Sequence, residues 1–582
     1  MKFSPWFFSF VCLFAACAVN SLAIDREAFT IRNYDLNLRI EPEQNRLGVR
    51  GKITLRNDTA TPQKLAVLQV SSALDWRSIS MADQPVQFVA QSYASDIDHT
   101  GALSEAIITL PAAIAPHTSV ELNIGYEGTI PLDATRLTRI GTPEDAARSA
   151  EWDEISPNFT ALRGAGYVAW YPIATDSANL SDGDSLFETL NRWKSREAGA
   201  DMHLRISVNT TGSAPPQMFL GEHPCTIGVY EQMDLAQLGQ AECKSEYPAF
   251  GTPLLLIADY STIERSGIEV HYLHGHDAAA AGYASEAEKL VPLITDWFGP
   301  LHQKAKIAEL PAPGAAPFES GTLLLTPLDP ASPDAANSLA DGLSAAHQLT
   351  HAAIHSFRPW IEEGLAHFAQ VLYLEREKGR EAALDYMQAH RSTLIASEKS
   401  AETPQVRDEV ARSLINTDNE ELYRSKAMYV WWMLREMVGD AALKKALAEY
   451  RPQQDKEPSY IQRLIAAHTQ RDLEWFFDDW VYRDRGLPDF KIESVFSRKA
   501  MTKVFLVTIT VDNLGAAGAE VPVLVKFSGG ELSKRLEVRA KDKATIRMET
   551  PAEPQEIIVN DGSVPESNRT NEVYKVASPD SQ

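Results

Sequence analysis

The period of the hydrophobic residues changes twice along this chain, and these two changes constrain its fold more than any other feature. Every second residue is apolar from Tyr34 to Ile40, from Val120 to Tyr126 and from Met202 to Val208. The same alternation returns late in the chain, from Val507 to Val511 and from Val521 to Phe527. A period of two places apolar side chains on one face of a β-strand. Both ends of the chain are therefore predicted to fold as β-sheets.

Between these two regions the pattern is helical. Residues 278–298 are rich in alanine and end at Phe298-Gly299-Pro300, a sequence that stops a helix. Apolar residues also recur at helical spacing from Ala427 to Val438. A chain of 582 residues is too long for a single hydrophobic core. We therefore predict a multidomain α+β protein with an N-terminal β-sandwich domain at 24–262, a mainly helical domain at 263–490 and a C-terminal β-sandwich domain at 491–582.

The N-terminus has the composition of a secretory signal peptide. Lys2 precedes an apolar run from Trp6 to Val19, and Ser21-Leu22-Ala23 fits a small-x-small cleavage site. The run is too short to span a membrane comfortably, and no later segment has a long enough apolar run. Cys17 lies in a segment that resembles a lipoprotein box only loosely. We expect residues 1–23 to be a signal peptide and the mature chain to be secreted or periplasmic, without a membrane span.

The net charge and the cysteines limit the partners and the cross-links of the chain. The formal net charge is −24, so electrostatic binding to nucleic acid is not expected. Cys225 and Cys243 are the only cysteines outside the predicted signal peptide, and they lack the CxxC spacing of zinc ligands. An oxidising compartment favours one disulfide between them. Two free thiols are the alternative.

A pair of histidines four residues apart is the strongest chemical signal in the sequence. His347 and His351 lie in a helical stretch, so both side chains face the same way and can reach one metal ion. Pro359 must end or break that helix, and a second helix begins near Trp360. If the two helices pack antiparallel, Glu363 lies at a similar depth to His351. Two imidazoles and one carboxylate are the protein ligands of a zinc site with an open fourth position.

This arrangement resembles the gluzincin metallopeptidases, and in particular the aminopeptidase N (membrane alanyl aminopeptidase) family. The family's zinc motif is HExxH followed by an NEGFA-like segment, and His347, His351 and Glu363 fall on its three ligand positions. Tyr423-Arg424-Ser425-Lys426-Ala427 resembles the family's YEKGA segment, whose tyrosine steadies the oxyanion. The resemblance implies a thermolysin-like catalytic domain, one Zn²⁺ per chain, a peptide substrate and an oxyanion role for Tyr423.

Gln348 departs from the family because it stands at the glutamate of HExxH. In the family this glutamate takes a proton from the attacking water and passes it on. An amide cannot accept that proton at neutral pH, and the loss of a general base typically costs ~10²–10⁴ in rate. The link from His351 to Glu363 is also shorter than the family's, with eleven intervening residues. The part of the cleft wall that this link forms must therefore be smaller.

The family's GxMEN motif, whose glutamate holds the free amino group of the substrate, has a degenerate counterpart here. The nearest match is Ala316-Pro317-Phe318-Glu319-Ser320-Gly321, in which Glu319 lies 28 residues before His347. The resemblance gives Glu319 the role of binding the substrate amine. The alternative is an ordinary loop carboxylate.

Three other candidate groups rank lower than these residues. His355 could replace Glu363 as a ligand, because it lies one turn beyond His351. Glu362 could replace the missing base, although it points about 100° away from Glu363 on the helix. A strand followed by a loop, rather than a metal cluster, explains the histidines at positions 271, 274 and 276.

The sequence therefore supports two functions. The first is an exported zinc metallopeptidase-like protein of aminopeptidase ancestry. It would hydrolyse N-terminal residues of peptides weakly or not at all, because Gln348 replaces the general base. The second is a non-catalytic peptide-binding or scaffold protein, a pseudopeptidase, that keeps the cleft.

Overall fold

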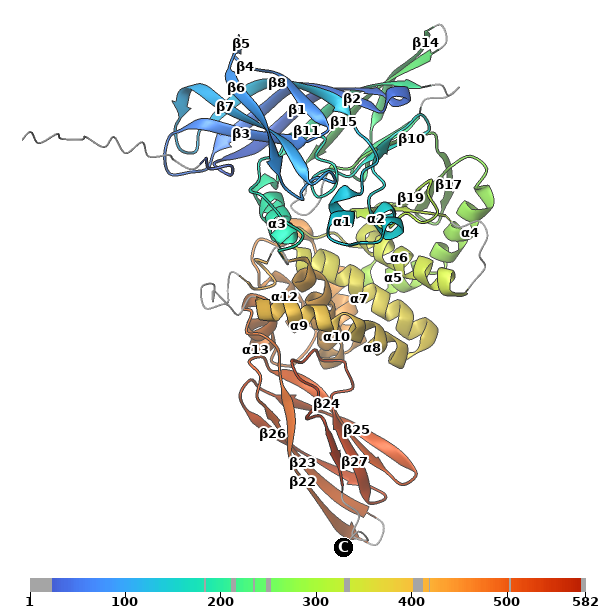
Figure 1. Cartoon of the computed structure of the whole chain (residues 1–582). Helices are drawn as coiled ribbons and strands as arrows, with labels where there is room; N and C mark the ends of the chain where they lie inside the picture. The colour runs from blue at the N-terminus through green and yellow to red at the C-terminus, as the bar shows by residue number, and fades with distance from the viewer. Residues whose placement is uncertain are drawn as a thin grey trace, which may run out of the picture.

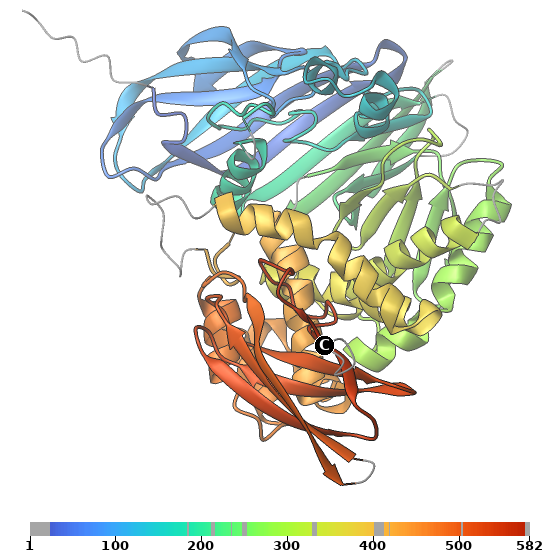
Figure 2. The same cartoon turned by 60° about the horizontal axis from the view of Figure 1, so that its bottom comes forward.

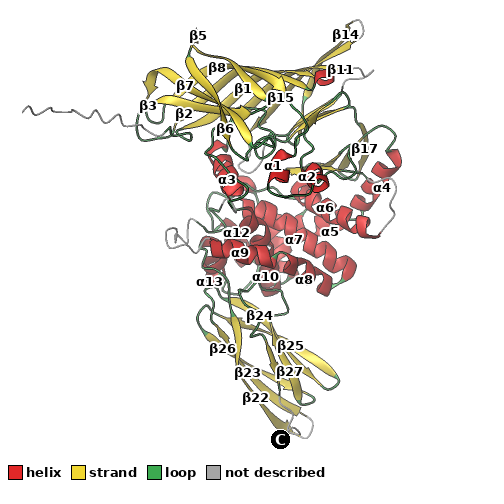
Figure 3. Ribbon diagram, in the orientation of Figure 1, coloured by secondary structure: helices red, strands yellow, loops and turns green. Residues whose placement is uncertain are grey.

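The structure is a computed structural model of the chain (Figure 1). It describes residues 24–182, 185–210, 216–233, 236–246, 253–328, 335–400, 412–417, 419–501 and 504–576. The predicted signal peptide at 1–23 lies outside the described residues. Helices gather between two strand-rich regions, in agreement with the two changes of the hydrophobic period (Figure 3). Within the described ranges, each helix is too short or too polar to cross a lipid bilayer.

An eight-stranded sheet holds the alternating segments of the N-terminal half. Its strand order is β14-β15-β11-β1-β2-β8-β4-β5. Strands β1 and β11 pair in parallel, with Tyr34 opposite Met202 and Ile40 opposite Val208, so their apolar faces coincide. Alternate residues of both strands are buried, which confirms the strands predicted there. The bounds are β1 (Phe29–Glu41), β2 (Arg46–Asn57), β4 (Leu74–Met81), β5 (Gln84–Pro85), β8 (Ser119–Thr129), β11 (Asp201–Thr210), β14 (Thr226–Met233) and β15 (Ala236–Glu246).

Two smaller sheets complete this half of the chain. One has the order β3-β7-β6 and the other the order β13-β12-β16-β10-β9. A hydrophobic core that includes Trp76, Tyr126 and Trp170 joins them to the eight-stranded sheet, and Trp193 of helix α3 packs into it. The bounds are β3 (Gln63–Ser71), β6 (Gln87–Ala94), β7 (Ala102–Ile114), β9 (Glu154–Ile155), β10 (Phe159–Leu162), β12 (Gln217–Leu220), β13 (His223–Pro224), β16 (Leu255–Ala258), α1 (Thr135–Arg139), α2 (Glu144–Ala150) and α3 (Ser185–Glu197).

A disulfide joins Cys225 to Cys243, as predicted from the sequence. Cys225 directly precedes β14, and Cys243 lies on β15, so the bond ties together two neighbouring strands at one edge of the eight-stranded sheet.

We expect thiol titration of the mature protein, denatured without reductant, to find no free thiol. After reduction the same titration should find two thiols per chain, since Cys225 and Cys243 are the only cysteines beyond residue 23. A result of two thiols before reduction would show that the bond does not form in the folded protein.

A five-stranded sheet and several packed helices form the middle of the chain. The sheet order is β17-β18-β19-β21-β20, and β20 is an antiparallel strand at its edge. Helix α7 packs against both α6 and α10, and the rings of Trp360 and Trp431 stack between α7 and α10 with their centroids 5.0 Å apart. The bounds are β17 (Ser261–Arg265), β18 (Ile268–Tyr272), β19 (Ala305–Glu309), β20 (Phe318–Ser320), β21 (Leu323–Thr326), α6 (Ala335–Ala353), α7 (Pro359–Lys378), α8 (Arg380–Ala389), α9 (Arg391–Ser400), α10 (Ala427–Val438), α11 (Asp440–Glu449), α12 (Tyr460–Ala466) and α13 (Glu474–Phe477).

The helical segment predicted at 278–298 is divided into two helices, α4 (Asp277–Glu288) and α5 (Val291–Phe298). Pro292 lies in the first turn of α5, where its lack of an N–H is tolerated. The same residue could not continue α4, because its ring would clash with the preceding turn. Helix α5 ends at Phe298, directly before Gly299, as the stop signal indicated.

The C-terminal strands form two sheets that share a core with the helices. The buried residues Val507, Ile509 and Val511 lie on β23, and Val521, Val523 and Val525 lie on β24, which confirms the alternation. These residues belong to one hydrophobic core that also contains buried residues of the helices. Its members lie between Ile268 and Val564 in the sequence. In both views the helices lie between the N-terminal sheets and these strands (Figures 1 and 2). The sheets have the orders β22-β23-β26 and β25-β24-β27-β28. Their bounds are β22 (Phe490–Met501), β23 (Val504–Asn513), β24 (Ala519–Phe527), β25 (Gly530–Val538), β26 (Lys543–Thr550), β27 (Pro554–Val559) and β28 (Val573–Lys575).

Candidate metal centre

Helices α6 and α7 bring the three predicted metal ligands together. His347 and His351 lie one turn apart on α6, and their Nε2 atoms are 3.0 Å apart. Glu363 lies in the second turn of α7, with its two carboxylate oxygens each 3.8 Å from one of these nitrogens. Helix α6 ends at Ala353 and α7 begins at Pro359, so the short link still forms a corner at which the three side chains converge.

Glu319 joins the same group from the edge strand β20. Its Oε1 atom is 2.7 Å from His347 Nε2 and 3.0 Å from His351 Nε2. Burial works against its ionisation, yet the two histidines hold the pKa of the Glu319 carboxyl well below its ordinary value. The side chain assigned to the substrate amine is therefore in direct contact with two predicted metal ligands.

The four donor groups fit a single zinc ion. One donor atom each from Glu319, His347, His351 and Glu363 lies within 4.8 Å of the others. Imidazole nitrogen and carboxylate oxygen are ordinary zinc ligands. Among the described residues this is the one such cluster of histidine, cysteine and carboxylate groups.

Glu362 supports this centre from outside. Its Oε1 atom is 3.2 Å from Nδ1 of His351 and 3.2 Å from Nδ1 of His355, and its other oxygen accepts the backbone N–H of Ser356. A carboxylate on Nδ1 fixes the ring so that Nε2 faces the metal position. Burial works against the charge on His351, yet Glu319 and Glu362 raise its pKa well above the ordinary value.

The alternative assignments fall elsewhere in the structure. Glu362 contacts the outer side of His351, and His355 is exposed and held by Glu362 rather than aimed at the other donors. Nδ1 of His271 is 3.1 Å from the hydroxyl of Thr262. His276 pairs with Glu309, and neither His271 nor His276 belongs to the group of possible metal ligands among the described residues.

Gln348 lies beside the centre without a partner for its carbonyl oxygen. The side chain is 1% exposed, and Oε1 has no hydrogen-bond partner among the described residues. It lines the same cavity as His347 and Glu363. A buried amide oxygen without a partner is costly, which suits a position where a bound ligand supplies a donor.

Tyr423 and Arg424 close another side of the cavity. They lie in a π-helical turn, Leu422–Lys426, directly before α10; such turns are frequent at functional sites. Arg424 Nε donates to Glu363 Oε2 at 3.2 Å, and the guanidinium also pairs with Glu420. Burial works against the charge of Arg424, but Glu363 and Glu420 raise its pKa above its ordinary value. Sequence reasoning did not single out Arg424. It could have been noticed because Arg424 stands at the position of the glutamate in the family's YEKGA segment.

A cavity of about 590 Å³ is lined by five of the six predicted site residues, all except His351. Helix α3 of the N-terminal half forms one wall, through Leu186, Phe187, Leu190 and Lys194. No motif or spacing in the sequence indicated that α3, which ends 150 positions before His347, lines this site.

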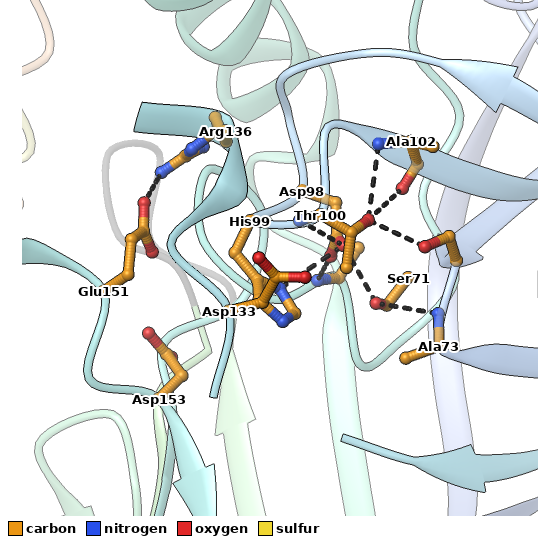
Figure 4. Close-up of polar contacts among 12 residues, drawn as sticks. Ser71, Ala73, Asp98, His99, Thr100, Ala102, Asp133, Arg136, Glu151 and Asp153 are labelled. Atoms are coloured by element: carbon orange, nitrogen blue, oxygen red, sulfur yellow. Dashed lines mark hydrogen bonds and ion pairs between the residues drawn. The ribbon is translucent and has the colours of Figure 1, made fainter. Parts of the chain in front are cut away.

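A buried polar network lies next to the part of the cavity wall that Arg136 and Glu151 form. Asp98 accepts hydrogen bonds from Ser71 and Thr100, and Arg136 pairs with Glu151 (Figure 4). Burial works against the charge on His99, but Asp98 raises the pKa of His99 to about 9. The network fixes the segment around Glu151, which borders the cavity.

Comparison with known proteins adds structural similarity at low sequence identity. No family model matches the sequence, and no curated protein matches it. The M1 zinc metallopeptidase from Deinococcus radiodurans is 16% identical, with 76% of this chain and 91% of that chain covered and a TM-score of 0.44. A mutant of that enzyme is 17% identical, with 80% and 96% covered and a TM-score of 0.45. With TM-scores below 0.5, the similarity to M1 zinc metallopeptidases assigns no function to this chain.

Proposed function

We propose that this chain is an exported zinc-binding protein of aminopeptidase type that hydrolyses N-terminal residues of peptides weakly or not at all. The observation that carries the proposal is the convergence of His347, His351 and Glu363 within 4.8 Å, together with Glu319. The buried amide of Gln348 lies beside them, at the place where such an enzyme needs a proton acceptor.

The side chains of the cavity suit the binding of a peptide more than its cleavage. Zinc held by this centre would act as a Lewis acid toward a peptide carbonyl only if one coordination position were open. Tyr423 would donate its hydroxyl hydrogen to the oxyanion of a tetrahedral intermediate. Gln348 can donate or accept a hydrogen bond, but it cannot take the proton of an attacking water. Hydrolysis of amino-acid amides by metal-free and zinc-loaded protein tests how much activity remains.

A second function, peptide binding without cleavage, is favoured by the wall that α3 contributes. Leu186, Leu190 and Lys194 follow one another at intervals of four residues, so they lie along one face of the helix. Burial lowers the pKa of the Lys194 ammonium group from the ordinary value, while the carboxylates of Glu420 and Glu363 oppose that shift. An apolar strip that ends in a cation fits a peptide with an apolar side chain and a nearby carboxylate.

Replacing Lys194 by methionine should weaken the binding of such a peptide by about 10–100-fold, because a hydrogen bond to a charged group contributes about 1.5–3 kcal/mol. Calorimetric titration of zinc-loaded protein with a short peptide measures the change. The same peptide with an amidated C-terminus identifies which carboxylate is bound. Lys289→Met, the same change at an exposed lysine directly after α4, should leave the affinity unchanged. Equal affinities for wild type and the Lys194 variant would remove Lys194 from the peptide site.

A further inference from the structure

Glu319 contacts the predicted metal ligands directly, whereas a residue that binds the substrate amine needs a carboxylate that is free to accept hydrogen bonds from that amine. Its Oε1 atom is closer to the two histidine Nε2 atoms, at 2.7 and 3.0 Å, than the oxygens of Glu363 are, at 3.8 Å. If Glu363 is a metal ligand on the basis of its position, Glu319 has at least the same geometric claim.

The spacing of these atoms agrees with four protein ligands around one ion. Zinc bonds of about 2.0–2.1 Å in a tetrahedron place neighbouring ligand atoms about 3.3 Å apart. The distances from the two histidine nitrogens to each other and to the nearer carboxylate oxygens run from 2.7 to 3.8 Å, on both sides of that value. One donor atom from each of the four residues lies within 4.8 Å of the others. Small side-chain shifts would therefore bring all four groups onto one ion. Two neutral imidazoles and two carboxylates would also balance its charge, as a buried ion requires.

Packing and hydrogen bonds hold the backbone on both sides of Glu319. The position of Glu319 therefore does not depend on the contacts of its own side chain alone. The ring of Phe318 packs edge-on against Trp152 and Tyr167, with centroids 6.4 and 5.6 Å away. The indole N–H of Trp152 donates to the carbonyl of Ala316 at 2.9 Å. On the other side, Glu222 accepts both the N–H and the hydroxyl of Thr322 at 2.7 Å.

We propose that Glu319 is a fourth protein ligand of the zinc ion, so that the site is closed and the ion joins β20 to the corner of α6 and α7. This inference rests on the zinc site of the proposed function. Structural zinc sites have four protein ligands, whereas catalytic sites keep one position open. A closed site is consistent with Gln348, because a general base is of no use where water cannot reach the metal.

Cobalt substitution tests whether a coordination position is open. Azide is a small anion that binds to exposed metal ions and changes the visible spectrum of Co²⁺. We expect azide to leave the spectrum of the Co²⁺-loaded wild-type protein unchanged, and to change that of Glu319→Gln. The affinity of Glu319→Gln for zinc, measured by competition with a chromophoric chelator, should fall by about 10–100-fold or more, since even outer partners of metal ligands have effects of that size.

Glu362→Gln is the matched comparison. It removes the negative charge of an outer contact of His351, so it should weaken zinc binding while the spectrum stays insensitive to azide. A clear response of the wild-type spectrum to azide would overturn the closed site, whether or not any variant folds. Wild-type zinc affinity in a folded Glu319→Gln variant would do the same. Failure of wild-type protein to bind any zinc or cobalt would instead reject the proposed function itself.

Discussion

In a protein that carries Glu319→Gln, the further change Gln348→Glu should raise the hydrolysis of amino-acid amides by about 10²-fold or more. The new carboxylate has nearly the size of the amide and supplies the missing proton acceptor, whose usual contribution is ~10²–10⁴ in rate. Tyr423 already lines the same cavity. The Glu319→Gln change comes first in this design, because the carboxylate of Glu319 lies against both histidine nitrogens and is the proposed fourth ligand, whereas an uncharged amide is a weaker zinc ligand.

The four combinations of these two residues form a double-mutant cycle. The gain from Gln348→Glu should be much smaller in the wild-type background than in the Glu319→Gln background. The gain is the ratio of the hydrolysis rates with and without the Gln348→Glu change, measured at the same residue 319. An effect of residue 319 on substrate binding enters both rates and therefore cancels. Zinc content and circular dichroism establish that each variant is loaded and folded. A full gain with Gln348→Glu alone would show that Glu319 leaves the metal open, and no gain in either background would favour the peptide-binding protein.

Replacing His351 by alanine should abolish stoichiometric zinc binding. His351 contributes Nε2 to the donor group and is held in place by Glu362 through Nδ1, so its loss removes a ligand and leaves Glu362 without one of its partners. Elemental analysis after dialysis should find one zinc per wild-type chain and close to none in the variant. Zinc at 100 times its dissociation constant should stabilise the wild type by about 2.7 kcal/mol, and this gain should also disappear.

His274→Ala is the control for this experiment, because His274 is an exposed histidine outside the donor group. It should retain one zinc per chain and the zinc-dependent rise in the unfolding temperature. A full equivalent of zinc in His351→Ala would place the metal elsewhere.

Features that depend on local periodicity could be predicted from the sequence. The alternating segments near Tyr34, Met202 and Val507 are strands with alternate residues buried, because side-chain direction in a strand depends only on position along it. The corner between α6 and α7 followed from Pro359, which the structure places at the first position of α7. The domain boundaries and the roles of the site residues stay predictions.

Features that depend on packing between distant segments could not be predicted. The contact of Glu319 with His347 exists because Phe318 packs against Trp152 and Tyr167, which belong to the N-terminal half of the chain. Lys194 reaches the cavity only because α3 lies beside it. No spacing rule links these segments, since their proximity follows from how the sheets and helices pack.

The unbroken core between the helices and the C-terminal sheets has a consequence for how the protein opens. Elements that share one core tend to unfold as one cooperative unit. A ligand that binds only the native form of α6 and α7 then stabilises the whole unit, including strands that lie far from it. The described strands from β22 to β28 contribute no donor atom to the metal centre, yet their residues belong to the same core as Leu349 and Leu365. Their backbone amides should therefore exchange hydrogen more slowly when zinc is bound, although none of them touches the ion.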